Sequence, residues 1–245
     1  MDVAIDLTPT PYYGDPNFPM VSTTKPERGT AHAYVFAVAT IAEPGFRPIV
    51  AIVFKHPTET CFDVLRELVG MLEQRHVQVR RLLLDRAFYS ANVISFLQRK
   101  RICFLMPARQ NRRAARLTTL SAAGTIIKFR LGTAEHTLIV ASYGDEKRPF
   151  ATNIPVNRES AELLVRVYRG RWGIETCFRQ VHDRRPRTTS RDPTVRAFYF
   201  LVSALIFNVW LLLNLKLSRT PGYETPVIAL VEVLAALSEP NLDTG

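Results

Sequence analysis

Four side chains that could bind a metal ion or a phosphate recur at helical spacing in one segment: Tyr168, Arg171, Glu175 and His182. Positions 168, 175 and 182 are separated by nearly two turns of an α-helix, and position 171 lies beside them. If 167–182 is a helix, one of its faces therefore presents a hydroxyl, a guanidinium, a carboxylate and an imidazole. Such a line could coordinate a metal ion and bind phosphate, or it could be an ordinary salt-bridged surface.

Apolar residues in and before this segment predict which side of the helix is buried. We expect core contributions from Leu163, Leu164, Val167, Ile174 and Phe178. A single glutamate among arginines belongs more often to a surface ion pair than to a catalytic site. A catalytic interpretation therefore requires further acidic residues from other parts of the chain.

Two aspartates elsewhere lie within or directly after short apolar runs. Asp6 lies in the run 3–7, a predicted first strand that the following prolines and glycine should break. Asp85 directly follows the apolar run 77–84, a predicted later strand. The carboxylate of Asp6 could cap a turn at Thr8, or it could be a metal ligand.

The alternation of apolar runs and turn residues predicts an α/β fold with a mixed sheet. The predicted strands are 3–7, 32–42, 47–54, 77–84, 102–106, 125–131, 136–142 and 150–154, and 15–29 is predicted to be a loop. The predicted helices are 58–74, 91–99 with Ser90 as a candidate cap, a helix that starts at 157–160 and includes 167–182, 197–215 and 227–237. The unit 77–106 is strand, helix, strand, so its strands should be parallel through a right-handed crossover. The strand 77–84 should also lie beside the first strand, which makes Asp6 and Asp85 neighbours. A helix packed across the sheet could bring Glu175 to both.

The segment 108–157 differs in composition and is predicted to be a β-rich insertion between Asp85 and Glu175. It starts with a basic, loosely patterned stretch at 109–116 and continues with a hairpin around 132–133. We divide the chain into a first part of the core (1–107), the insertion (108–157), the helix of Glu175 with the following core helix (158–216), and a C-terminal helix and tail (217–245).

Composition favours a polyanionic partner. The 245 residues include 32 Lys and Arg against 22 Asp and Glu, which gives a formal net charge of +10. An arginine-rich excess suits phosphate contacts, so nucleic acid is the first candidate. Hydrophobic residues make up 47%, which is enough for a core and argues against a disordered chain. The three cysteines are far apart and form neither a metal-binding pair nor a disulfide framework, as is typical of the reducing cytoplasm.

One uncharged run, 197–215, is about as long as a membrane span. It contains Ser203, Asn208 and Asn214, and it follows an arginine-rich segment. We therefore interpret it as a buried core helix and expect no membrane association. A C-terminal membrane anchor is the alternative.

Asp6, Asp85 and Glu175 together would form a site of carboxylate oxygens. Hard oxygen ligands without paired Cys or His suit Mg²⁺ or Mn²⁺ rather than Zn²⁺. Two such ions, about 4 Å apart, can activate a water molecule and stabilise the leaving oxygen of a phosphodiester.

On these residues the sequence resembles the DDE transposases of insertion sequences, which have a ribonuclease-H-like catalytic fold. It is similar to the subgroup with a Tyr-Arg-Glu-Lys signature, because Tyr168, Arg171 and Glu175 have its spacing of three and four residues. The segments VAIDLTPTPYYG, with Asp6, and LLLDRAFYS, with Asp85, resemble the strands of the first and second acids. The resemblance implies a ribonuclease-H-like mixed sheet flanked by helices, with a β-rich insertion between the second Asp and the Glu.

The implied reaction is metal-dependent cleavage of DNA followed by strand transfer. Asp6, Asp85 and Glu175 would be the catalytic residues and would bind two Mg²⁺ or Mn²⁺ ions. The implied partner is double-stranded DNA, at the ends of the element and at the target, bound by a homodimer. We expect the protein in the cytoplasm, associated with the nucleoid.

The resemblance also implies a set of DNA-binding residues. Tyr168 and Arg171 would orient the backbone near the scissile phosphate, and Arg184 and Arg185 would contact phosphates independently of sequence. His182 stands where the signature has Lys, and its charge depends on pH near neutrality.

Two other functions fit the same residues. A ribonuclease-H-like nuclease would use the same acids but would not join strands. An inactive, truncated DNA-binding remnant is the second alternative. His182 favours it, as does the absence of the helical DNA-binding region that family members usually have before the first catalytic strand.

Overall fold

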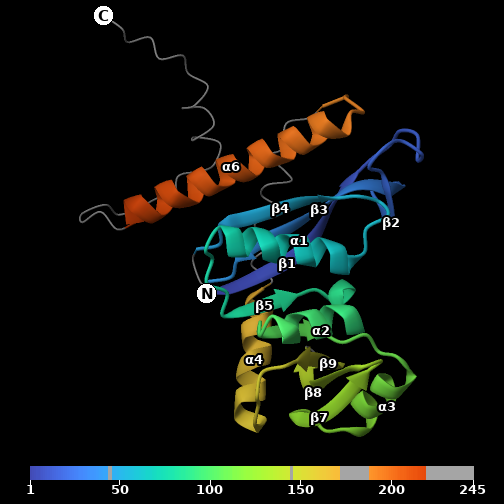
Figure 1. Ribbon diagram of the computed structural model, residues 1–245, viewed down its shortest axis with the longest axis vertical. Helices are drawn as coiled ribbons and strands as arrows, with labels where there is room; N and C mark the ends of the chain where they lie inside the picture. Colours follow the sequence, from blue (N-terminus) through green and yellow to red (C-terminus); the bar gives the residue numbers. More distant parts are fainter. Residues whose placement is uncertain (44–45, 144–145, 172–187, 219–245) are drawn as a thin grey trace, which may run out of the picture.

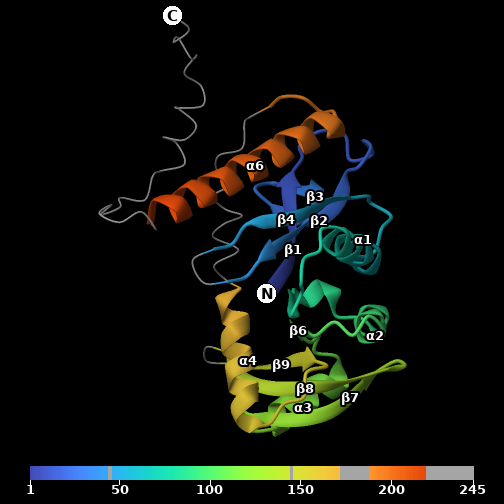
Figure 2. The ribbon, with the colours of Figure 1, turned by 60° about the vertical axis from the view of Figure 1, so that its left-hand side comes forward.

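One mixed sheet connects all the strands that the structure describes. The structure is a computed structural model, and it describes residues 1–43, 46–143, 146–171 and 188–218. Within these residues, nine strands are ordered β2-β3-β1-β5-β6-β9-β8-β7, and β4 pairs with β3. Figures 1 and 2 show β2, β3 and β4 at one end of the molecule and β7, β8 and β9 at the other. The strands are β1 (Asp2–Pro11), β2 (Ser22–Glu27), β3 (Thr30–Ile41), β4 (Ile49–Lys55), β5 (Arg81–Leu84), β6 (Phe104–Pro107), β7 (Thr125–Leu131), β8 (Ala134–Tyr143) and β9 (Glu146–Thr152).

Helices flank this sheet, as the predicted fold class requires. The described helices are α1 (Cys61–Gln74), the 3₁₀ turn η1 (Arg86–Phe88), α2 (Ala91–Arg99), α3 (Arg112–Leu120), α4 (Arg158–Gly170) and α6 (Pro193–Ser218). The predicted cap of α2 is confirmed, because the Ser90 hydroxyl accepts a hydrogen bond from the Val93 amide at 3.3 Å. In α1, Thr60 and Asp63 form a reciprocal capping box.

The centre of the sheet has the predicted strand order. β1 pairs antiparallel with β3 and parallel with β5, with Ile5 opposite Leu84. β5 pairs parallel with β6, as expected for two strands joined through α2. The first strand and the strand before Asp85 are therefore side by side.

We predicted that β1 ends before Pro9, but the strand continues to Pro11. β5 pairs only with the first part of β1, from Asp2 to Ile5. Past that point the amide of Leu7 bonds to the carboxylate of Asp6 rather than to a strand. Backbone N–H groups of successive residues in a strand point to opposite edges, and the N–H of Leu7 points away from β3. Pro9 and Pro11 are two and four residues further on, so the N–H groups that they lack would also point away from β3, and no hydrogen bond between β1 and β3 is lost.

Asp2 fixes the start of β1 to the start of β5. Its carboxylate accepts hydrogen bonds from Arg80 Nε at 2.9 Å and from Arg81 Nη2 at 2.5 Å. Burial of Asp2 acts to raise its pKa, but the hydrogen bonds and charges of the two arginines outweigh burial and hold the pKa below its usual range. This buried ion pair sets the register between the two strands that carry the predicted acids.

Two elements were not predicted. β2 lies in 15–29, which we expected to be a loop, and it pairs only with the edge of β3. α3 lies in the basic stretch that we expected to be irregular. Its N-terminus is capped by Asn111, whose side chain accepts a hydrogen bond from the Ala114 amide at 2.8 Å.

The insertion extends the same sheet. The predicted hairpin around 132–133 is confirmed as β7 and β8, which pair antiparallel. β9 begins at Glu146, four residues before the predicted strand 150–154, and pairs with both β8 and β6. The strands of the insertion are thus continuous with the central strands through β6.

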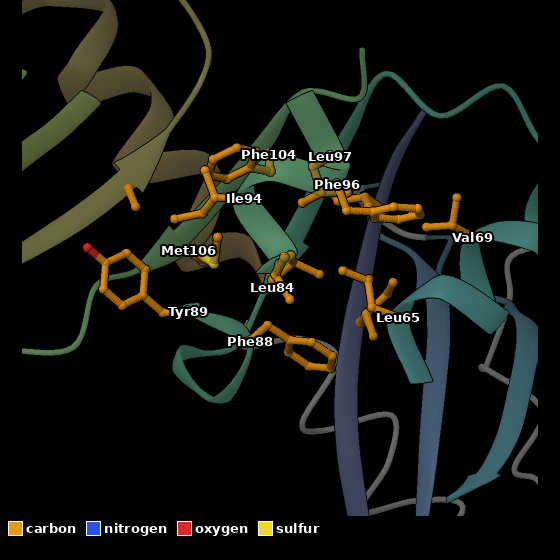
Figure 3. Packing of buried hydrophobic residues seen from close by; sticks show 14 of the residues in the cluster. Leu65, Val69, Leu84, Phe88, Tyr89, Ile94, Phe96, Leu97, Phe104 and Met106 are labelled. Carbon is orange, nitrogen blue, oxygen red and sulfur yellow. The ribbon is translucent and has the colours of Figure 1, made fainter. Parts of the chain in front are cut away.

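Alternate residues of the central strands face two separate cores. Val3 and Ile5 of β1 pack on the side of α1 and α2, in the cluster of which Figure 3 shows Leu65, Leu84 and Leu97. Ala4 of β1 belongs to the second core, together with residues of α4 and α6. A sheet covered on both faces explains why its central strands are apolar almost throughout.

α6 differs from its prediction as a buried core helix. Its buried residues form one stripe: Phe200, Ser203, Ala204 and Phe207. The ring of Phe200 stacks on Phe36 of β3 with centroids 4.0 Å apart. Several large apolar side chains of α6 are exposed: Phe198, Leu201, Leu205, Leu212 and Leu213. Among the described residues, α6 is the one helix that is long and apolar enough to cross a membrane.

Candidate active site

Strand geometry places Asp6 and Asp85 on the same face of the sheet. Ala4 of β1 is opposite Leu83 of β5, and both belong to the core that contacts α4 and α6. Side chains two residues apart on a strand point to the same face. Asp6 is two residues after Ala4, and Asp85 is two residues after Leu83. Both carboxylates therefore lie on the side of the sheet that α4 covers.

Asp6 is held by two hydrogen bonds to its carboxylate. Oδ1 accepts from the Leu7 amide at 3.0 Å, and Oδ2 accepts from Arg171 Nη1 at 3.2 Å. The side chains of Asp6 and Arg171 are 19% and 7% exposed, so this ion pair is largely removed from solvent. The guanidinium compensates the charge of a carboxylate that would otherwise be buried in an apolar sheet.

Asp85 stands where β5 ends and the backbone turns. Its carbonyl accepts a hydrogen bond from the Phe88 amide at 3.0 Å, which closes η1. Its half-buried carboxylate makes no hydrogen bond or ion pair with any residue in the described part of the chain. This carboxylate is thus directed at the site without being committed to a structural partner among those residues.

α4 brings Tyr168 and Arg171 to these strands. Asn157 caps the helix in a capping box with Ser160, which confirms the predicted start of this helix. The buried stripe of α4 is Ala161, Leu164, Val165 and Tyr168. α4 ends at Gly170, and the part of the predicted helix from 172 to 182 lies outside the described residues.

Tyr168 belongs to the core and not to an exposed polar line. It is 2% exposed, and its hydroxyl donates a hydrogen bond to the Leu84 carbonyl at 3.1 Å. Its ring packs edge-on against Phe150 of β9, with centroids 5.2 Å apart. Burial raises the pKa of Tyr168 well above its usual range, so the phenol stays protonated.

The described part of this segment corrects two predictions. Tyr168 and Arg171 are buried, so they do not form the salt-bridged surface that was the alternative. Leu163 and Val167, which we expected in the core, are exposed, whereas Leu164 is buried as predicted. The buried face of α4 is therefore the one that includes Leu164 and Tyr168, and not the predicted face with Leu163 and Val167.

A hollow of about 480 Å³ opens beside Asp85. Its lining includes the cationic side chains of Arg86, Arg148 and Arg171, together with Glu146, which pairs with Arg148 at 3.3 Å. The guanidinium of Arg148 lies over the ring of Tyr143 at 4.7 Å from its centroid. No pattern in the sequence pointed to Tyr143 of β8 and Arg148 of β9, because the pairing of β8 with β9 and of β9 with β6 brings them to the site from far along the chain.

Comparison with known proteins agrees with this arrangement. Residues 3–209 match the family defined by the transposase DDE domain. The chain belongs to this family. The resemblance to DDE transposases is thereby confirmed at the level of the family. No match is found among curated proteins.

A solved transposase structure has the same fold as this chain. The chain is similar to the piggyBac transposase in a cryo-EM synaptic complex with hairpin DNA, with a TM-score of 0.67 and 12% identity. The match covers 98% of this chain and 55% of that chain, so this chain spans about half of its length. Endonuclease V of Bacillus subtilis has a TM-score of 0.33 at 9% identity, over 65% of this chain and 68% of that chain, which is too low to support an argument.

The described part of the site fits a hard divalent cation. Its acidic ligands would be oxygen atoms of Asp6 and Asp85, which is the donor type that Mg²⁺ and Mn²⁺ prefer. No group of three or more His, Cys, Asp or Glu in the described ranges could bind a metal ion. The third predicted ligand, Glu175, lies outside these ranges, as do His182 and the predicted phosphate contacts Arg184 and Arg185.

Proposed function

We propose that this chain is a transposase of an insertion sequence that cleaves DNA and transfers the freed strand with divalent metal ions. The observation that carries the proposal is the placement of Asp85, directly after the end of β5, beside Asp6 in the middle of the adjacent parallel strand β1, on one face of the sheet, in a member of the DDE family. Carboxylates fixed in this way can bind a common pair of ions.

In this proposal each acid has a defined role. Asp6 and Asp85, with Glu175 from outside the described residues, coordinate the ions, and Arg171 keeps the charge of Asp6 compensated. When bound, Mg²⁺ or Mn²⁺ would lower the pKa of the attacking water and neutralise charge on the phosphate. The arginines around the hollow beside Asp85 hold the DNA backbone within reach of these acids.

Positive charge supports double-stranded DNA as the partner, at the element's ends and at the target. The net charge of +10 would steer DNA to the site, and Arg184, Arg185 and His182 are proposed phosphate contacts. We also propose a homodimer on DNA, a cytoplasmic location at the nucleoid, and no membrane association. The packing of Phe200 of α6 on Phe36 of the sheet supports the last point.

The spacing of Tyr168, Arg171 and Glu175 supports membership of the Tyr-Arg-Glu-Lys subgroup. The strands β7 to β9 between Asp85 and α4 agree with the β-rich insertion expected of that subgroup. We keep the division of the chain at residues 107, 157 and 216 as part of this proposal.

Cleavage and joining of labelled DNA test this function. We expect the wild-type chain to cut element-end DNA and to form joined product in Mg²⁺ or Mn²⁺. Asp85→Ala should abolish both reactions and leave DNA binding intact, and Glu67→Ala, an exposed acid of α1, should change neither. Cleavage without joined product would favour the nuclease, and DNA binding without either reaction would favour the inactive remnant. Full activity of Asp85→Ala would contradict the assignment of the site.

A further inference from the structure

The hydroxyl of Tyr168 is committed to the protein backbone. It donates its hydrogen bond to the Leu84 carbonyl, and the side chain is almost fully buried between β5 and β9. A phenol has a single proton to donate, and the oxygens of a phosphodiester only accept. Tyr168 therefore cannot donate to a DNA phosphate unless it releases the Leu84 carbonyl.

The group that Tyr168 holds is the last residue before Asp85. β6 pairs with β5 only at Leu82 and Leu83, so the end of β5 lies beyond its pairing with that neighbour. A hydrogen bond from α4 to the Leu84 carbonyl restrains the backbone at the point where the chain turns into η1. The direction of the Asp85 side chain depends on that restraint.

Arg171, less than one turn further along, makes the corresponding contact with the other strand. Its guanidinium donates to Oδ2 of Asp6 at 3.2 Å and also lies over the Tyr168 ring, 5.3 Å from the ring centroid. The end of α4 is thus bonded to β1 through Asp6 and to β5 through Leu84. Two adjacent carboxylates repel each other, so a fixed support is needed to hold them at a set separation.

We propose that Tyr168 and Arg171 are positioning residues that set the separation and direction of Asp6 and Asp85, and that Tyr168 makes no contact with DNA. This inference rests on the proposed function, because it assumes that the two aspartates bind metal ions. It assigns to Tyr168 a different task from the orientation of the DNA backbone that the sequence suggested.

Substitution Tyr168→Phe separates the two tasks, because it removes one oxygen and keeps the packing of the ring. The matched control is Tyr34→Phe, since Tyr34 is also buried and donates to a backbone carbonyl, that of Arg191, away from the acids. We expect Tyr168→Phe to weaken Mn²⁺ binding, measured by calorimetry without DNA, by about tenfold. DNA affinity in EDTA should change less than about twofold, and Tyr34→Phe should change neither.

The opposite pattern would overturn the inference: unchanged Mn²⁺ binding with a loss of DNA affinity in EDTA. The proposed function fails by a different result, namely full cleavage by Asp85→Ala, so the two failures are distinguishable. Nitration of tyrosines in the wild-type chain gives a test that needs no variant. Tyr13, which is 68% exposed, should react, and Tyr168 should resist with and without DNA. Reaction of Tyr168 in the free protein and its protection by DNA would contradict the inference.

Discussion

The ion pair between Asp6 and Arg171 can be measured with a double-mutant cycle. The two charged groups are 3.2 Å apart and largely buried. Asp6→Ala or Arg171→Ala alone leaves the other charge without this partner in a poorly solvated place, whereas the double variant leaves neither charge. We therefore expect the losses of unfolding free energy in the two single variants to add up to more than the loss in the double variant.

The expected coupling follows from the geometry. Unit charges at this distance attract by about 5 kcal/mol at an effective dielectric constant of about 20. The 19% exposure of the Asp6 side chain lets water screen part of that attraction. We expect single variants to lose about 2–4 kcal/mol of unfolding free energy and the coupling to be about 2 kcal/mol.

Urea unfolding followed by circular dichroism gives the four free energies of this cycle. The control cycle uses Lys100 and Glu73, an exposed pair at 3.0 Å, for which we expect a coupling below about 0.5 kcal/mol. A coupling between Asp6 and Arg171 no larger than that of the control pair would refute the argument that α4 is bonded to β1 through a buried charge pair.

Three further predictions concern the parts of the fold that support the site. The pKa of Asp2 in the folded protein is lowered from 3.8, so its ion pair stabilises the fold above pH 3.8. This stability is lost as the pH falls through the lowered pKa, and urea melts between pH 6 and pH 3 would show the loss. Asn208→Ala removes two hydrogen bonds to the backbone of Ile49, at 2.8 and 2.7 Å, and should cost about 1–3 kcal/mol in the same melts. Phe200→Ala should cost about 3–5 kcal/mol, whereas Leu205→Ser on the exposed face of α6 should cost less than about 0.5 kcal/mol.

Each of these predictions has its own contrary result. Asp2→Asn should show little of the acid-dependent loss, and a variant as acid-sensitive as the wild type would argue against the ion pair as its source. An effect of Leu205→Ser equal to that of Phe200→Ala would mean that both faces of α6 are covered in solution.

Local sequence signals predicted the centre of the sheet well. Apolar runs and a strand-helix-strand unit were sufficient to place β1 beside β5, because right-handed crossovers leave few alternatives. Ser90 and Asn157 were predicted to start helices, and both cap their helices through side-chain oxygens. These features depend on residues close together in the chain.

The incorrect predictions depended on contacts between distant residues. β1 tolerates Pro9 and Pro11 because β5 is too short to pair beside them, and the sequence of β1 contains no sign of that length. The burial of Tyr168 depends on its contacts with Leu84 and Phe150, which the order of strands brings together. Helical spacing alone grouped Tyr168 with polar residues, although its face of α4 is the buried one.

The prediction for α6 was wrong for a related reason. A helix with an uncharged run as long as 197–215 is expected to be buried on all sides in a protein core. Within the described residues, however, one side of α6, around Phe200, Phe207 and Asn208, packs against the sheet, and the opposite side is exposed. Hydropathy reports the composition of a helix and not the number of elements available to cover it.

Metal rescue at Asp85 is the most direct test of the central claim that Asp6 and Asp85 bind the catalytic metal ions. A thiolate at this position prefers softer ions than Mg²⁺. Asp85→Cys should therefore cleave element-end DNA poorly in Mg²⁺ and recover in Mn²⁺, with DNA affinity unchanged. Two results would contradict the account: equal activity of Asp85→Cys in both metals, or a control variant Glu67→Cys that is also poorly active in Mg²⁺ and restored by Mn²⁺.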